Sequence, residues 1–203
     1  LISQASSAIN DAQNKIKEAS NLGADVGTAQ QSLNQADGTY SSANSYVSNA
    51  ETAYNSGNYQ SASNYASQAQ SSANSAKSSA QNAKAQATTI IEEWNKLKTA
   101  AEGKIRQSNS DIDTAKQRIE TAEKVLNDAT VIGIDTAKAK SQIATARSKV
   151  ESADAYSQEA SSIFDTATNT QSFDNAKAQA QSATDIAKEA ENLAALSAMD
   201  KDR

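Results

Sequence analysis

The sequence has no cysteine, no histidine and no proline, and it has only six glycines in 203 residues. Without cysteine the chain cannot form disulfides or Cys-ligated zinc sites, and without histidine it lacks the commonest catalytic base. Proline and glycine usually interrupt regular structure, so their scarcity predicts long helices joined by few loops. Aromatic residues make up only 4% of the chain, which disfavours strands. We therefore expect an all-α protein.

Charge and hydrophobicity argue against two further classes of partner. The net charge is −5 at pH 7, whereas a nucleic-acid-binding surface needs a basic stripe. No apolar run approaches the roughly 18 residues of a membrane span, so we expect no membrane insertion by this segment. The first residues, LISQASSAIN, lack the basic start and apolar core of a signal peptide. We expect them to belong to the interior of a longer chain.

The sequence repeats itself with a shift of 110 positions, under which Ile9 falls on Ile119. A four-residue insertion then changes the shift to 114, and Tyr59 falls on Phe173. Agreement at the apolar positions indicates an internal duplication. Other matched pairs are Ala12 and Ala122, Leu33 and Ile143, Ala50 and Ala160, and, after the insertion, Ala62 and Ala176, Ala66 and Ala180.

Each copy contains three helical segments whose apolar residues recur at alternating spacings of three and four, the pattern of a coiled-coil seam. Gly23, Gly133 and Gly57 are suited to the left-handed conformation just past the end of a helix. Asp25 and Asp135 are the expected N-caps of the helices that follow. The expected helices cover residues 2–22, 25–56 and 59–100 in the first copy, and 101–132, 135–166 and 172–199 in the second.

The seam does not stop where the first copy ends, because its alternation passes through Ile90 and Trp94 into the second copy. This continuity predicts one helix from about Tyr59 to Ile132. The expected fold is two tandem antiparallel three-helix bundles with an Ala-rich coiled-coil seam, which share this long continuous linker helix. The two bundles would comprise residues 1–100 and 101–203.

One irregularity interrupts the alternation near the junction of the copies. Leu97, Ala101 and Ile105 are separated by two successive steps of four, and Gly103 lies beside them. Such a stutter locally unwinds a supercoil, and glycine weakens a helix. These four residues are the candidate hinge.

Aromatic side chains are the candidate recognition residues, and each has two interpretations. Trp94, the only tryptophan, is either an exposed anchor or, as its seam position favours, a packing residue at the junction. Tyr54 and Tyr59 flank the NSGN turn and could stack sugars, but their seam positions favour a packing role. We expect the aromatic residues near each hairpin to plug the end of the bundle; these are Tyr54, Tyr59, Tyr65, Phe164 and Phe173.

Catalytic, metal and cofactor motifs are absent from the sequence. Glu92 and Glu93 point about 100° apart on a helix, and Asp111 and Asp113 diverge further. These carboxylates are expected to belong to solvated helix faces. We expect no catalytic, metal-binding or cofactor-binding residues and no enzymatic activity.

The first copy contains the motif A-x3-I-x2-A-x2-LG-x-D-V-x2-A-x3-L-x2-A, followed by AYNSGNY. This motif resembles helical repeats of archaeal and some bacterial cell-surface, S-layer-associated proteins. The resemblance covers about residues 1–80 and 111–194. The shared-helix architecture is similar to spectrin repeats, although alanine here replaces the charged, Leu-rich seam of spectrin. The stretch AYNSGNYQSASNYASQA also resembles a tetratricopeptide fragment, but its flanking expected helices are more than twice as long.

The leading functional hypothesis is a non-catalytic structural spacer or stalk segment of a larger cell-surface protein, whose partners are the other domains of that chain. A Ser/Asn/Gln exterior with few charges, as between Asp25 and Ala76, is more common in surface stalks. The alternative is a protein-docking scaffold, cytoplasmic or at the surface, with a binding face along its long helices. A lipid-binding bundle is disfavoured because the apolar faces are Ala-rich with little flanking basic charge.

Overall fold

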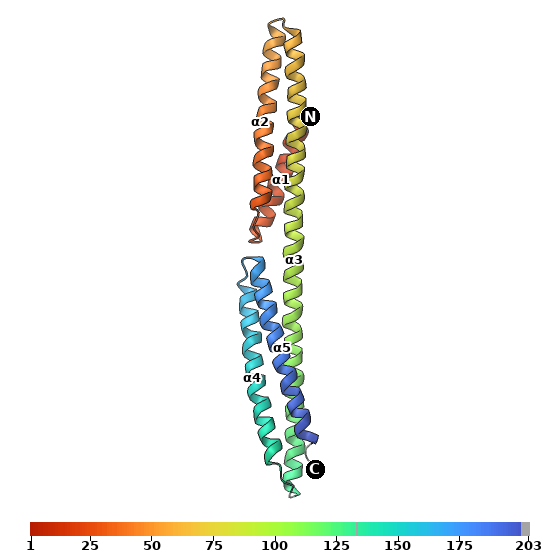
Figure 1. Cartoon of the computed structure of the whole chain (residues 1–203), viewed down its shortest axis with the longest axis vertical. Coiled ribbons are helices and arrows are strands. Elements are labelled where there is room, and N and C mark those ends of the chain that lie inside the picture. The colour runs from red at the N-terminus through yellow and green to blue at the C-terminus, as the bar shows by residue number, and fades with distance from the viewer. Residues whose placement is uncertain (133, 200–203) are drawn as a thin grey trace. The chain divides into compact units, whose positions relative to one another are not determined.

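The computed structural model describes residues 1–132 and 134–199, and within them the chain forms five helices and no strand (Figure 1). This confirms the prediction of an all-α protein. The helices are α1 (Ile2–Asn21), α2 (Gly27–Asn55), α3 (Tyr59–Val131), α4 (Ala137–Asp165) and α5 (Thr170–Met199). The chain divides into two compact units, Leu1–Asn95 and Lys96–Arg203.

The first unit contains α1, α2 and the first part of α3, packed around a core of small side chains (Figure 1). Alanine dominates this core, and small side chains allow helix backbones to approach closely. Because alanine buries little apolar area, the stability of such a core accumulates along its length. The core residues are Ile9, Ala12 and Ile16 from α1, Ala29, Leu33 and Ala36 from α2, and Ala80, Ala83 and Ala87 from α3.

Polar contacts fix the direction of α1 relative to α3 within this unit. Lys77 Nζ lies 3.2 Å from Gln4 Oε1, and Lys84 Nζ lies 2.9 Å from Asp11 Oδ2. Both pairs are 73 residues apart in the sequence, so α1 and α3 run in the same direction. The start of α1 therefore lies beside the α3 turn around Lys77, and the earlier turns of α3 extend beyond it.

Glycine ends α1 and α2 where the sequence predicted. Gly57 has a φ of +78°, a conformation that glycine adopts without a steric penalty, and Gly23 has a φ of +81°. The N–H of Asn58 donates to the carbonyl of Ala53 at 2.9 Å, which satisfies a carbonyl left free at the end of α2. Gly133, the corresponding prediction in the second copy, lies outside the described residues.

The prediction that Asp25 and Asp135 are N-caps is wrong by one position. Asp25 Oδ1 accepts a hydrogen bond from the N–H of Gly27 at 2.9 Å, but Gly27 is the first residue of α2, so Val26 occupies the N-cap position. Asp135 contacts the first N–H of α4 in the same way, at 2.9 Å. Each carboxylate still satisfies a free N–H and places negative charge at a helix N-terminus.

The second unit contains α4, α5 and the part of α3 from Lys96 onward (Figure 1). Its core has the same Ala-rich character, with Ile112, Ile119 and Leu126 from α3 facing Ile143 and Val150 from α4 and several alanines of α5. Ion pairs between helices also hold this unit together. They join Lys116 to Asp154, Arg118 to Glu191, Arg147 to Glu123, and Lys149 to Glu189.

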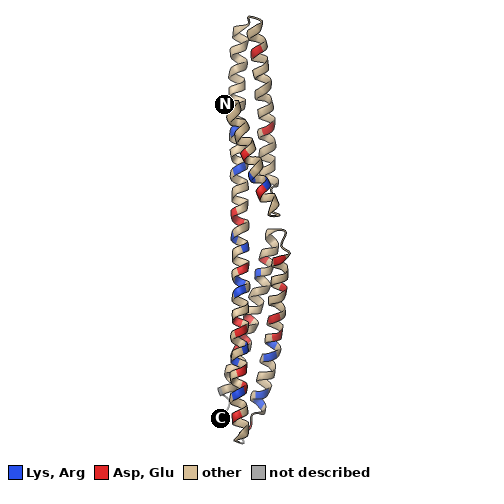
Figure 2. Cartoon of the chain, turned by 180° about the vertical axis from the view of Figure 1, so that it is seen from behind, with Lys and Arg blue, Asp and Glu red and all other residues tan. Residues whose placement is uncertain are grey.

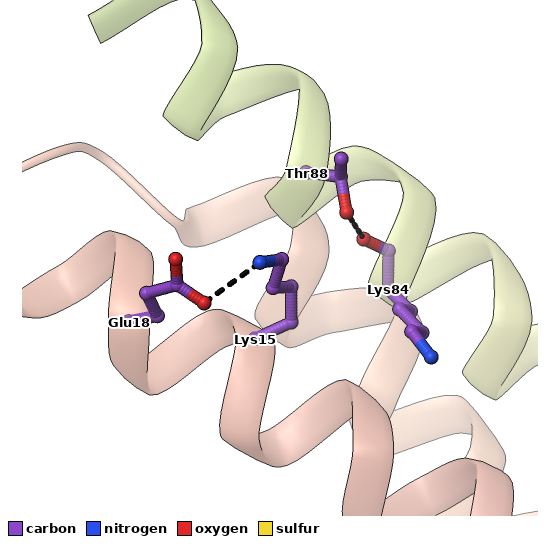
Figure 3. Close-up of polar contacts among 4 residues, drawn as sticks. All are labelled: Lys15, Glu18, Lys84 and Thr88. Carbon is purple, nitrogen blue, oxygen red and sulfur yellow. Dashed lines mark hydrogen bonds and ion pairs between the residues drawn. The ribbon is translucent and has the colours of Figure 1, made fainter. Parts of the chain in front are cut away.

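Charge is distributed unevenly along the helices (Figure 2). Between residues 26 and 76 the only charged side chains are Asp37 and Glu51, whereas α4 and α5 carry many. Hydroxyl groups on the helix exteriors often bond to the preceding turn, as Thr88 Oγ1 does to the Lys84 carbonyl at 2.9 Å (Figure 3). Such bonds satisfy the hydroxyl within its own helix, so a Ser- and Thr-rich face needs no partner.

The seam differs from the expected pattern at one position in α3. Ile91 is buried and Ile90 is only partly buried against the core, whereas the sequence placed Ile90 on the seam. Ile90 and Ile91 lie three and four residues after the buried Ala87. Both therefore border the seam, and small rotations of the helix decide which one faces inward.

Candidate functional site

The candidate hinge residues all lie within α3, which is helical across them. Ala101 is buried, while Leu97 and Ile105 are half-buried. A Cβ added to Gly103 would have no neighbouring atom within 4 Å, so packing does not require glycine at this position. The hinge itself stays a prediction, since it concerns motion.

Trp94 is only 4% exposed and lies on the buried side of α3. Its position agrees with the packing interpretation of this residue. An exposed recognition anchor would need an accessible ring, and the indole here offers little surface to a partner.

Tyr54 and Tyr59 do not plug the end of a bundle, which corrects the expectation from the sequence. They are 63% and 66% exposed, and their rings meet edge to face with centroids 5.5 Å apart. The physical reason is that α1 starts beside the α3 turn around Lys77 and so does not reach this end of the α2–α3 pair. In the second unit Phe173 is 3% exposed and contacts Phe164 at 5.6 Å, as expected for a plug.

An open apolar groove runs along α2 and α3 beyond the start of α1, and we call it the α2–α3 groove. One part, of about 570 Å³, is lined by Ala50, Glu51, Tyr54, Asn55, Tyr59, Ala62, Ser63 and Ala66. A second part, of about 450 Å³, shares Ala50, Glu51 and Ala66 and continues to Leu1 and Ile2. The shared residues make the two parts contiguous. Small apolar residues line most of its length, and Glu51 is its only charged side chain.

The carboxylates that the sequence singled out all lie on α3. Glu92, Glu93 and Asp113 are exposed on α3, and Asp111 accepts a hydrogen bond from Gln107 at 2.7 Å. Among the described residues, no group of three or more carboxylates could hold a metal ion. By contrast, the α2–α3 groove presents small apolar side chains and the Glu51 carboxylate.

One exposed ion pair has perturbed titration. The Arg147 guanidinium donates two hydrogen bonds to the Glu123 carboxylate, at 2.6 and 2.7 Å, from Nε and Nη2. These bonds hold the pKa of Glu123 below its ordinary value and raise the pKa of Arg147. This bidentate ion pair joins α3 to α4, and its two hydrogen bonds explain both pKa shifts.

Two buried serines and the exposed Asn109 form a small polar cluster in the second unit that was not predicted from the sequence. Ser108 Oγ lies 3.0 Å from Ser157 Oγ, and Ser157 Oγ donates to Asn109 Oδ1 at 2.7 Å. The available signal was a mismatch between the copies, because Val47 stands in the first copy where Ser157 stands in the second.

No protein-family model, curated protein or solved structure matches this chain. The resemblance to cell-surface helical repeats therefore stands only on the motif residues given above. Within the described helices, no stretch has the combined length and hydrophobicity needed to cross a lipid bilayer.

Proposed function

We propose that this chain is a non-catalytic structural spacer, built from two tandem three-helix bundles, in a larger cell-surface protein. The observation that carries the proposal is the repeated Ala-rich seam, buried in each of the two units. A seam of this kind supports a long, thin bundle, because it adds a little stability with each turn and needs no bulky core.

The surface of the first unit supports the same role. Its Ser-, Asn- and Gln-rich exterior carries few charges, and several of its hydroxyls bond within their own helices. Such a surface offers few strong electrostatic contacts to other molecules. In this proposal the residues Leu97, Ala101, Gly103 and Ile105 form the one soft point of the spacer.

Small-angle X-ray scattering on the 203-residue chain tests the spacer. A spacer must hold its ends apart, and a helix of the 73 residues of α3 is about 110 Å long at 1.5 Å per residue. We expect a maximum dimension of at least that length. A compact particle with a much smaller maximum dimension would reject the proposal.

A second candidate function, a protein-docking scaffold, is favoured by the open α2–α3 groove. The two candidates differ in how they respond to changes at the soft point. In a spacer, Gly103→Ala leaves the attachment of the parent protein to its surface unchanged. Loss of binding to a specific ligand in that variant would favour the scaffold instead.

A further inference from the structure

Matched positions of the two copies differ sharply in exposure at one end of each unit. Tyr59 is 66% exposed, and its counterpart Phe173 is 3% exposed. Ala66 is exposed, whereas its counterpart Ala180 is fully buried. The residue types are alike in each pair, so the difference comes from what covers them.

In the second unit the covering element is the part of α3 that precedes Asp111. Ser108 is fully buried there and lies 3.0 Å from Ser157 of α4, next to which Ala160 is also fully buried. Position 111 corresponds to position 1 under the 110-residue shift. The segment of residues 97–110 therefore covers, in the second unit, the region that corresponds to the α2–α3 groove.

In the first unit, none of the described residues covers the corresponding region of α2 and α3. α1 begins at Ile2, and Leu1 and Ile2 line the near end of the groove. Ile2 is half-buried although its counterpart Ile112 is only 2% exposed. The groove thus begins where α1 begins and follows the direction that α1 would take if it were longer.

We infer that the α2–α3 groove is a docking site for an amphipathic helix that prolongs α1, with apolar and small residues at spacings of three and four on its inner face. The side chains of the docked helix should resemble those of residues 97–110, with one difference. Val47 replaces Ser157 on the groove floor, so the occupant should carry an apolar residue where the second unit has Ser108. A basic residue at the rim would complement Glu51. This inference does not depend on the spacer proposal.

The test adds a copy of residues 97–110 directly before Leu1, with Ser108→Ala in the added copy, and measures amide hydrogen exchange. We expect exchange of the amides in residues 47–66 to slow on the order of tenfold, because docking suppresses local opening of the α2–α3 end. A matched control carries the same extension with Ala101→Glu and Ser108→Glu, and in it exchange should match that of the parent chain.

A second variant checks the site on the groove floor. Ala62 is only half-buried in the parent chain, so Ala62→Glu should leave the parent folded. In the extended chain it should abolish the added protection. Equal protection by both extensions, or no protection by either, would overturn the inference. Sedimentation showing a dimer of the parent chain, with these amides already protected, would also overturn it in favour of a second copy.

Discussion

Tyr59 and Phe173 occupy the same position of the internal repeat, yet the tyrosine is two-thirds exposed and the phenylalanine is buried. Tyr59 is the first residue of α3 and Phe173 is the fourth residue of α5. Each contacts the aromatic residue across the hairpin, Tyr54 or Phe164. The ring contact is therefore preserved while the burial is not. Whether the aromatic pair becomes part of a core depends on whether the remaining helix of the unit, which is α1 in the first unit and α3 in the second, packs against the hairpin.

The matched alanines Ala66 and Ala180 differ in exposure in the same way, so the same substitution should affect stability differently at the two positions. Ala180→Glu buries an unpaired charge and should cost about 3–5 kcal/mol, whereas Ala66→Glu lies at an exposed position and should stay within about 0.5 kcal/mol. Both changes exchange alanine for the same good helix former, so helix propensity contributes equally. Urea denaturation of the two variants measures the difference, and equal losses would contradict the burial difference between the units.

The ion pair between Glu123 and Arg147 should make stability depend on pH. The hydrogen bonds from Arg147 hold the pKa of Glu123 below the ordinary value of 4.5. Because the folded pKa is the lower one, the stabilisation is complete above the unfolded pKa and is lost as the pH falls through the folded pKa. Glu123→Gln should lower the melting temperature slightly near pH 7, and its difference from the parent should vanish once the pH falls below the folded pKa of Glu123.

The control for this prediction is Glu159→Gln, which removes an exposed carboxylate from the helix that carries Arg147. Its difference from the parent should be smaller at neutral pH. A Glu123→Gln difference that persists unchanged at low pH would mean that the loss has another origin. High salt should also weaken the effect, because both partners are partly exposed.

Gly57→Ala tests the turn between α2 and α3. Gly57 has a φ of +78°, and a side chain in this left-handed conformation costs about 1–2 kcal/mol. Gly38 lies inside α2 with open space around its missing Cβ, so Gly38→Ala should instead stabilise by about 0.5–1 kcal/mol. Thermal melting of both variants checks the opposite signs, and a stabilising Gly57→Ala would contradict the left-handed conformation of Gly57.

The helices could be predicted from the sequence because their signals are local. The glycine that ends α2 and the alternating spacing of the seam need no knowledge of the tertiary structure. Two further local signals are the asparagines that precede α3 and α5. Asn58 accepts the N–H of Ser61 at 3.1 Å, and Asn169 accepts that of Ser172 at 3.0 Å, so both cap the helix that follows.

Burial around the candidate site could not be predicted from spacing alone. Tyr59 has the seam position of a core residue, but its exposure depends on whether another helix reaches it. The same limit applies to Ile90 and Ile91, which flank the seam equally until packing selects one of them. The α2–α3 groove likewise depends on which helices reach the α2–α3 end, and that is set by the tertiary structure.

The candidate hinge leads to a prediction with a control inside the same chain. Gly103 and Gly38 both lie within helices, and an added Cβ would meet nothing within 4 Å at either position. Replacing either glycine by alanine should therefore stabilise the chain by about 0.5–1 kcal/mol, since alanine loses less conformational entropy on folding. Only Gly103→Ala should also slow amide hydrogen exchange within residues 97–105, because only Gly103 lies beside the stutter formed by Leu97, Ala101 and Ile105. If Gly38→Ala slowed exchange there equally, or if Gly103→Ala changed only global stability, bending would not be concentrated at the stutter and the hinge assignment would be wrong.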